Sequence, residues 1–337
     1  MSQEMTAVVM THPGGPEVLE PRRLPLPWPR SDRHVLVRLK AASVNPADVY
    51  FRSLGPYIQS EEPCILGHDG AGVVAEVGAA VTRFRPGDEV CFCNGGLGGD
   101  PGTYADYAAV PEAQLAAKPA GVSFEETAAL PLVFITAWEA LVERAGLKAG
   151  ERVLIHAGAG GTGHIAVQLA ALEGAKVAAT VSSQAKADFI RRLGAERPIL
   201  YREEDFVETA RSWSQGRGLD VALDNVGPEA MQRTYRAMAP YGRIVTLMGT
   251  PGDDAEETAY VQNLTIHNVM MLTPMVQGLA ERLAGQAAIV TKGMALLAEG
   301  KLKPHIAASF PLAEAAAAQA RLEAGGTTGK IVLTMEG

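Results

Sequence analysis

The sequence predicts an α/β fold with a β-rich N-terminal part followed by a doubly wound parallel sheet. Short strand patterns separated by turns dominate residues 1–125. From Arg152 onward, strand and helix patterns alternate, which indicates a parallel sheet covered by helices on both faces. The last patterned segment, Lys330–Leu333, returns to a strand. A chain of 337 residues also exceeds one ordinary core, so two domains are expected.

The β-rich part contains four strand patterns, at residues 7–10, 34–39, 72–78 and 89–93. Turn signals stand between them, among them Pro13–Pro16, Pro86–Asp88 and the glycine-rich Asn94–Gly102. Several short strands broken by such turns predict a small barrel.

A helical stretch follows. Ser123 and Glu126 have the spacing of a capping box, in which the hydroxyl caps the Glu126 amide and the carboxylate reaches back. We expect a long helix from there toward Arg144, with a kink at Pro131.

The alternating region then predicts strands at residues 152–156, 176–181, 197–200, 220–224, 243–248 and 265–272. Helices are expected between most of them, including residues 186–193, 206–215 and 229–238. Two further helices at residues 277–299 and 312–323 precede the final strand.

Charge and composition exclude several classes of partner. The formal net charge is −8 and no run of Lys and Arg occurs, so the electrostatic footprint of nucleic-acid binding is missing. No signal peptide is visible, and no apolar run reaches the ~18 residues of a membrane span. We therefore expect a cytoplasmic protein. Cys64, Cys91 and Cys93 form no disulfide framework, and the last two are expected to pack as small apolar groups on one strand face.

A glycine motif, His156–Gly163, follows the strand pattern at 152–155 and opens a helix pattern. Strand, G-x-G-x-x-G and helix in this order predict a Rossmann site for a dinucleotide, whereas the motif alone would also suit a surface loop. Gly158 allows the tight turn, Gly160 lets the backbone approach the pyrophosphate, and Gly163 lets helix and strand pack closely. Amides at the helix N-terminus then face the phosphates.

The second strand of this region predicts which dinucleotide is bound. NAD-binding folds carry an acidic residue at the end of that strand, but residues 174–187 contain none. Ser182, Ser183 and Lys186 stand there instead, and hydroxyls with a cation suit a 2′-phosphate. We predict NADP(H). The alternative is that Ser182 caps a helix and Lys186 is a solvated surface charge.

Several segments resemble one family along nearly the whole chain. The resemblance is carried by Asn45–Arg52 (N-P-x-D-x-Y-x-R), Gly67–Val74, Arg85–Val90, Gly102–Tyr107, Leu130–Pro131, Thr136–Trp138, the glycine motif and Gly329–Leu333. These segments resemble the quinone oxidoreductases, the zinc-free branch of the medium-chain dehydrogenase/reductase superfamily that includes zeta-crystallin.

The resemblance implies a GroES-like catalytic domain, residues 1–126 plus 275–337, and an inserted Rossmann NADP(H)-binding domain, residues 127–274. It implies an active site in the cleft between the domains. It also implies a homodimer formed by pairing of the strand near residues 265–272. The substrate pocket would be lined by residues 50–60, 92–99 and 269–276.

One residue also points to the zinc branch of the same superfamily. His68 stands where zinc alcohol dehydrogenases carry a metal-binding histidine, but Asn45 and Leu132 occupy the positions of the two expected cysteines. A catalytic zinc needs three protein ligands. We therefore expect no metal and interpret His68 as a buried or cleft-lining histidine. Asp69 departs from the glutamate usual at its position, and the sequence leaves its role open.

The resemblance also implies which residues contact the cofactor. The pyrophosphate would lie on the glycine loop, and the 2′-phosphate and adenosine would lie at the end of the second strand. The residues concerned are Gly158, Gly160, Gly161, Thr162 and Gly163 for the loop; Ser182, Ser183, Lys186 and Tyr201 for the adenosine end; Asn225, Val226, Met248 and Gly249 for ribose and nicotinamide; Thr136 for the carboxamide; and Asn45 and Lys330 beside the cofactor.

Without a metal, no Lewis acid polarises a simple carbonyl. The expected hydride acceptor is therefore a quinone or a carbon–carbon double bond conjugated to a carbonyl. Tyr50 and Tyr57, with Asn45, are the candidate catalytic residues, and a tyrosine hydroxyl could donate to the developing oxyanion. Alternatively, Tyr50 is a half-buried aromatic with a solvated hydroxyl, and Tyr57 only shapes a loop.

Two other functions remain open from the sequence. A zinc-dependent alcohol dehydrogenase is disfavoured by Asn45 and Leu132. An NADPH-binding protein without turnover would carry the same glycine loop, because a fold does not fix a function.

Overall fold

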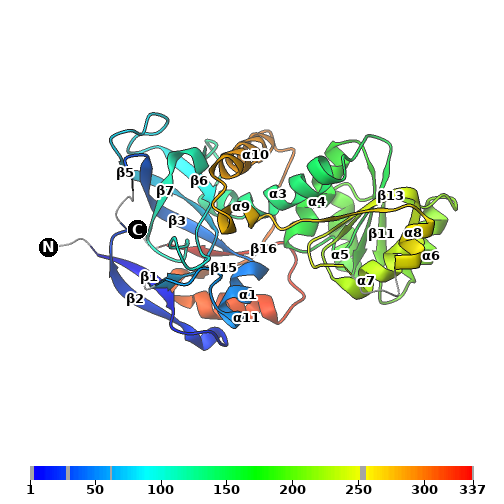
Figure 1. Cartoon of the computed structure of the whole chain (residues 1–337), viewed down its shortest axis with the longest axis horizontal. Coiled ribbons are helices and arrows are strands. Elements are labelled where there is room, and N and C mark those ends of the chain that lie inside the picture. Colours follow the sequence, from blue (N-terminus) through cyan, green and yellow to red (C-terminus); the bar gives the residue numbers. More distant parts are fainter. Residues whose placement is uncertain (1–3, 28–30, 61–62, 251–255, 336–337) are drawn as a thin grey trace. The chain divides into compact units, whose positions relative to one another are not determined.

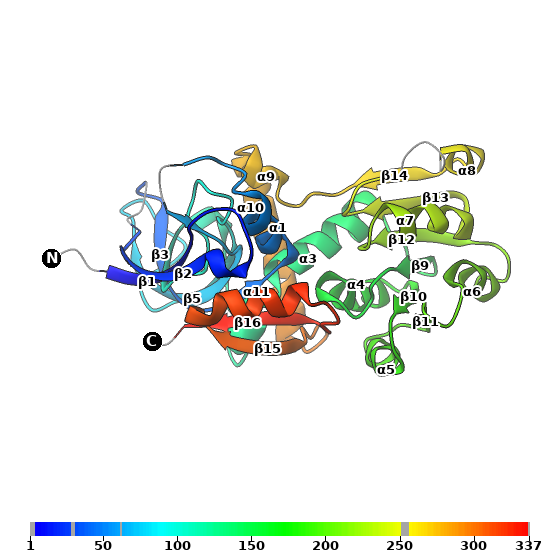
Figure 2. The same cartoon turned by 90° about the horizontal axis from the view of Figure 1, so that it is seen from below.

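A computed structural model describes residues 4–27, 31–60, 63–250 and 256–335 of the chain. The chain divides into two compact units, Met1–Leu132 with Leu272–Gly337 and Val133–Met271. Their strands and helices can be followed in Figures 1 and 2. The domain boundaries expected from the sequence, after residues 126 and 274, stay a prediction.

The first unit is built on β-strands. A three-stranded sheet has the order β2 (Leu19–Pro25), β1 (Glu4–Met10), β4 (Cys64–Ile65). A seven-stranded sheet has the order β15 (Ile306–Pro311), β16 (Lys330–Thr334), β3 (His34–Val44), β5 (Asp69–Val77), β6 (Glu89–Cys93), β8 (Leu115–Ala117), and β7 (Tyr107–Pro111) also pairs with β3. The four predicted strands are all present.

The C-terminal tail completes this unit. Strand β16 pairs antiparallel with β3, with Ile331 opposite Val44. Helix α11 (Ala315–Glu323) contacts α1 (Pro46–Leu54), and the buried Arg52 of α1 makes a two-point ion pair with Glu323 at 2.7 and 2.9 Å. The chain's two ends therefore form one folding unit.

The helical stretch after the β-rich part is broken where the sequence predicts. Ser123 caps α2 (Phe124–Ala128): its Oγ accepts from the Glu126 amide at 3.1 Å, and the Glu126 carboxylate accepts from the Ser123 amide at 3.2 Å. A new helix, α3 (Pro131–Trp138), begins at Pro131 and continues as the π-helical η3 (Glu139–Arg144). The capping box is confirmed, whereas the single kinked helix expected from Ser123 toward Arg144 is wrong, because α2 ends at Ala128 and a second helix begins at Pro131.

The second unit is a six-stranded parallel sheet. Its order is β11 (Arg197–Leu200), β10 (Lys176–Val181), β9 (Arg152–Ile155), β12 (Leu219–Asp224), β13 (Met238–Thr246), β14 (Thr265–Asn268). This is the strand order of a doubly wound dinucleotide-binding sheet. The chain adds strands toward one edge from β9 to β11 and then toward the other edge from β12 to β14, so the strand order reverses between β9 and β12. The predicted fold class is confirmed.

Helices cover the sheet because its strands carry apolar side chains that need burial. Leu154, Ala178, Ala222 and Ile244 are adjacent in register and share one face. They form a core with residues of α6 (Phe206–Trp213) and α7 (Pro228–Thr234), here Phe206, Ala210 and Met231. Helix α4 (Gly161–Leu172) contacts β9 and β10, and α5 (Gln184–Arg192) contacts β10 and β11.

Several predicted bounds were wrong. The strand predicted to reach residue 272 ends at Asn268, and the buried Met271 and Leu272 precede α9 (Thr273–Val276). Their apolar character reflects burial outside a strand. The tail helices begin later than predicted, as α10 (Ala280–Ala298) after Gly278 with φ +63°, and as α11 after the 3-10 turn η6 (Leu312–Glu314). Helix α7 also ends four residues early, because β13 begins at Met238.

The sequence missed β2, β4, β7, β8 and β15. Strand β2 is an edge strand whose residues are mostly exposed, so it lacks the apolar alternation that reveals a strand. One further short helix, α8 (Glu256–Val261), precedes β14. In the described ranges, no helix combines the length and the apolar character needed to cross a bilayer.

Candidate active site

The glycine loop lies at the point where the strand order of the second unit reverses. It follows the carboxyl end of β9, and Asn225 follows the neighbouring β12. The Asn225 side-chain amide donates to the His156 carbonyl at 2.9 Å, which joins the two strand ends. Its Oδ1 is buried, and none of the residues that the structure describes forms a hydrogen bond with it. Ligands of doubly wound folds bind at this reversal point.

The loop is shaped for a backbone that closely approaches its surroundings. A Cβ on Gly163 would lie 2.1 Å from the Ala157 carbonyl oxygen, and one on Gly158 would lie 2.6 Å from the Ala179 Cβ. Gly160 is the N-cap residue, and Gly161, Thr162 and Gly163 form the first turn of α4. Free amides at this end suit a pyrophosphate, so the residues present fit a dinucleotide.

Two loops beyond the neighbouring strands are ordered by Asp224. Its carboxylate accepts from the amides of Val226 (3.0 Å) and Gly227 (3.1 Å) and from the Thr246 hydroxyl (3.1 Å). That hydroxyl oxygen accepts from the Met248 amide, also at 3.1 Å. Asp224 thereby holds the segments Asn225–Val226 and Met248–Gly249, in which Val226 and Met248 are exposed.

The end of β10 carries the residues predicted for the 2′-phosphate. Ser183, not Ser182, is the N-cap residue of α5 and accepts from the Lys186 amide at 3.5 Å. This corrects the alternative in which Ser182 caps the helix. The Tyr201 amide donates to the Val181 carbonyl, and the Arg202 guanidinium lies 6.0 Å from the Tyr201 ring centroid. Arg202 is a cation at this strand end that the sequence analysis missed.

In the first unit, four buried polar side chains gather where β3, β5 and β16 meet. We call Ser43, Asn45, Asp69 and Lys330 the Asp69 cluster. The Asp69 carboxylate accepts from Ser43 Oγ at 2.6 Å, from Asn45 Nδ2 at 2.9 Å and from the Leu132 amide at 2.7 Å. Lys330 Nζ lies 3.7 Å from Asp69 and donates to Asn45 Oδ1. The sequence left the role of Asp69 open. In the structure its carboxylate accepts hydrogen bonds from three donors and lies beside the Lys330 ammonium.

The charges of the Asp69 cluster compensate each other. Burial lowers the pKa of Lys330, and the Asp69 carboxylate opposes that change. Asn45 uses both ends of its amide within the cluster, so its orientation is fixed. Asn45 and Lys330, both predicted to lie beside the cofactor, are therefore neighbours in the fold. Their contact with the cofactor stays a prediction.

A second buried pair, Asp48 and His68, lies beside the Asp69 cluster. His68 Nδ1 donates to the Gly95 carbonyl at 2.6 Å, and its Nε2 faces Asp48 Oδ1 at 3.6 Å. The other Asp48 oxygen accepts hydrogen bonds from the backbone amide of Asn45 and from the Tyr104 hydroxyl. Burial raises the pKa of Asp48. His68 is fully buried, as one of the two interpretations predicted.

Tyr50 and Tyr57 are brought together around one buried ring. Both form edge-to-face contacts with Phe51, at centroid distances of 5.5 and 6.5 Å, and Phe51 contacts His68 in the same way. The two tyrosines are 58 and 56 % exposed. The Ile58 amide donates to the Leu97 carbonyl, which joins two of the segments predicted to line the substrate pocket.

Thr136 lies in α3, where its side chain is buried. Cys91 and Cys93 are both buried on β6, as predicted. Among the residues that the structure describes, no three His, Cys, Asp or Glu side chains are grouped so that they could hold a metal ion.

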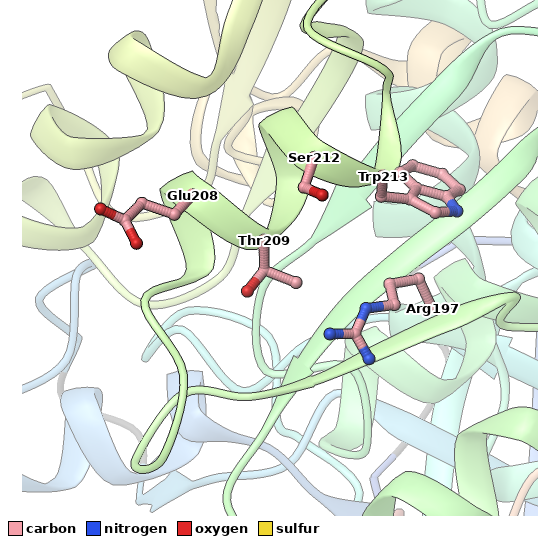
Figure 3. A pocket seen from close by; sticks show the side chains of 5 residues that line it. All are labelled: Arg197, Glu208, Thr209, Ser212 and Trp213. Carbon is pink, nitrogen blue, oxygen red and sulfur yellow. The ribbon is translucent and has the colours of Figure 1, made fainter.

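A separate hollow of about 380 Å³ lies in the second unit beside α6 (Figure 3). It is lined by Arg197, Glu208, Thr209, Ser212 and Trp213. No predicted site residue lines it, and Arg197 is already paired with Glu204. The hollow therefore adds nothing to the candidate site.

The sequence analysis missed Ser43, Asp48 and Tyr104 as parts of the site. It also missed His156, which follows β9, and Thr180 of β10, whose side chains face each other at 3.3 Å. Asp48 stands within the N-P-x-D segment and His156 opens the glycine motif, so both had a local signal. Ser43 and Thr180 lie inside apolar strands, where only the three-dimensional arrangement reveals their partners.

Two family models match the chain. Residues 31–120 match the model described as alcohol dehydrogenase GroES-like domain, and residues 193–333 match the model described as zinc-binding dehydrogenase. A doubly wound sheet with a glycine loop at its reversal point accompanies them here. These features define an oxidoreductase of the medium-chain dehydrogenase/reductase superfamily, whose members bind a pyridine nucleotide.

Relatives narrow the assignment. A quinone oxidoreductase of Pseudomonas aeruginosa is 34% identical over 95% of this chain and 96% of its own. A 2-haloacrylate reductase of a Burkholderia species is 33% identical over 97% of this chain and 98% of its own. An alcohol dehydrogenase superfamily protein from Novosphingobium aromaticivorans has a solved structure with a TM-score of 0.90, 35% identity and coverage of 98% and 100%. The chain belongs to the zinc-free quinone oxidoreductase branch, which confirms the resemblance.

Proposed function

We propose that this oxidoreductase uses NADPH to reduce a quinone or a carbon–carbon double bond conjugated to a carbonyl, without a metal. The observation that carries the proposal is the glycine loop at the reversal point, where a Cβ on Gly163 would overlap a backbone oxygen. The substrate class is supported by the names of two relatives, a quinone oxidoreductase and a 2-haloacrylate reductase.

The bound dinucleotide supplies the hydride. The chain's own residues bind it, orient it and handle the proton. Amides at the start of α4 would bind the pyrophosphate, and the Asp224-ordered loops would position ribose and nicotinamide. The Tyr50 hydroxyl, exposed beside Phe51, would donate a hydrogen bond to the oxygen of the acceptor as negative charge develops there.

A catalytic zinc does not fit the side chains present. The Asn45 side-chain amide is hydrogen-bonded to Lys330 and Asp69. The Leu132 side chain has no atom that could bind a metal, and His68 Nδ1 donates to the Gly95 carbonyl. Zinc sites of this kind need three protein ligands and one open position.

The test measures NADPH consumption by protein treated with a chelator in the presence of a 1,4-quinone, a simple enone or an enoyl thioester. A parallel assay measures NADP⁺ reduction with a primary alcohol. Turnover of the quinone or an alkene without metal supports the proposal, and the best acceptor names the substrate class. Alcohol oxidation that zinc restores would instead support a zinc dehydrogenase. NADPH binding without any turnover would support a binding protein.

Cofactor preference gives a prediction at the end of β10. Lys186→Ala should weaken NADPH binding about tenfold or more while leaving NADH binding nearly unchanged, because it removes a charge-assisted contact to the 2′-phosphate alone. Arg202→Ala should act in the same direction. Glu208→Ala, on α6, is the control. Equal losses for both cofactors would contradict the NADPH assignment, and fluorescence titration measures them.

Tyr50→Phe should lower kcat about a hundredfold, because it removes one donor to the developing oxyanion. The KM for NADPH should stay unchanged, since the hydroxyl contacts only the acceptor. Tyr57→Phe is the matched control and should have a smaller effect. An intact kcat in Tyr50→Phe would mean that the proton comes from water or another group.

The protein is further proposed to be a homodimer. Strand β14 pairs with β13 on one side, and no strand of the described residues pairs with its other edge. An open edge is a template for pairing with another chain. Sedimentation equilibrium should give about twice the chain mass of 35.5 kDa. A monomer at micromolar concentration would contradict this.

A further inference from the structure

His156 is the one residue of the glycine motif that carries a polar ring, and it is buried at the end of β9. Its partners determine where its proton lies. The Thr234 hydroxyl donates to the Ala230 carbonyl at 2.8 Å, so its oxygen can only accept from His156 Nε2, also 2.8 Å away. Nε2 is therefore protonated, and Nδ1 is an acceptor in the neutral ring.

The acceptor Nδ1 faces the Thr180 hydroxyl at 3.3 Å. The Thr180 hydroxyl donates to Nδ1, and its oxygen accepts from the Ala157 amide at 3.0 Å; the bond to His156 directs the hydroxyl hydrogen away from that amide. The Thr180 carbonyl also accepts from the Gly158 amide at 2.9 Å. Thr180 thus holds the first two residues of the loop, and His156 orients its hydroxyl.

Ala157 needs this hold because its φ is +49°, in the left-handed region that disfavours residues with a Cβ. Its carbonyl accepts from the Gly160 amide and lies where a Cβ on Gly163 would be. If Ala157 relaxed to an ordinary backbone conformation, that carbonyl would turn and the path of residues 157–163 would change.

We propose that His156 is a positioning residue for the cofactor: through Thr180 it holds Ala157 in its left-handed conformation and so presets the loop that binds the pyrophosphate. The inference rests on the proposed NADPH binding. His156 itself does not touch the cofactor in this scheme. Its ring also packs edge-to-face on Phe206, at a centroid distance of 4.9 Å, which fixes the ring plane.

The test compares His156→Phe and the isosteric Thr180→Val with the parent. Each should raise the Kd and KM for NADPH about tenfold, while kcat at saturating NADPH changes less than about twofold. His12→Phe, at an exposed position, is the control with the same substitution and should bind like the parent. Thr180→Val keeps the test valid if His156→Phe folds poorly.

Ala157→Gly provides the discriminating measurement. Glycine adopts a positive φ without a penalty, so adding Ala157→Gly to either variant should restore most of the NADPH affinity. Hydrogen exchange of residues 157–163, measured without cofactor, should be faster in His156→Phe than in the parent and unchanged in His12→Phe. Unchanged exchange and affinity in His156→Phe and Thr180→Val, or no recovery with Ala157→Gly, would overturn the inference.

Failure of the proposed function has a different signature. If the parent bound neither NADPH nor NADH, the function would fail, while the exchange rates would still report whether His156 and Thr180 preset the loop.

Discussion

Replacing Asp69 with alanine is expected to lower the free energy of unfolding by about 3 to 5 kcal/mol. The change would leave the buried Lys330 ammonium without its carboxylate, and would leave the donors of Ser43, Asn45 and the Leu132 amide without an acceptor. A buried charge without a partner costs far more than a well-made pair contributes. Urea denaturation at pH 7, with hydrogen exchange of β3, β5 and β16 amides, measures the loss.

The partner variant gives the double-mutant cycle. Lys330→Met should be destabilising alone, but in the Asp69→Ala background it should cost less, because no charge is then left buried. The exposed ion pair of Glu20 and Arg22 is the control, and Glu20→Ala should change the stability by at most about 1 kcal/mol. Additive effects of Asp69→Ala and Lys330→Met would show that the two charges do not compensate each other.

The second large effect is a loss of stability at acidic pH that depends on His156. Burial lowers the pKa of His156 from 6.5 to about 4, with the Asp224 carboxylate opposing this and Arg233 adding to it. Below pH 6.5 His156 becomes protonated in the unfolded chain, but in the folded chain it stays neutral until about pH 4. The free energy of unfolding therefore decreases as the pH falls through this window. At about 1.4 kcal/mol per pKa unit, the loss approaches about 3 kcal/mol near pH 4.

His156→Phe should therefore be less stable than the parent at pH 7 but should lose less stability between pH 6.5 and pH 4. The slope of unfolding free energy against pH, measured by urea titration at several pH values, separates the two effects. His12→Phe, at an exposed position, should keep the slope of the parent. A parent-like slope in His156→Phe would mean that other groups carry the acid sensitivity of the protein.

Local patterns were sufficient for much of the fold. The parallel strands β9, β10 and β12 contain short apolar runs, the capping box at Ser123 is a contact three residues apart, and Pro131 is the first residue of a new helix. The predictions for strand β2 and for the end of β14 were wrong because local patterns were misleading there. Their residues are exposed, or buried without strand pairing, so apolar spacing did not report their conformation.

Sequence patterns alone were enough to predict the glycine loop, the order of strands and helices around it and the lack of an acidic residue after β10, because each depends on residues close together in the chain. Tertiary structure decided what surrounds these residues. Ser43, Asp69 and Lys330 come from three strands, and Thr180 reaches the Ala157 amide from a neighbouring strand. Buried polar groups need partners at hydrogen-bond distance, and only the folded chain brings partners so far apart in sequence to that distance.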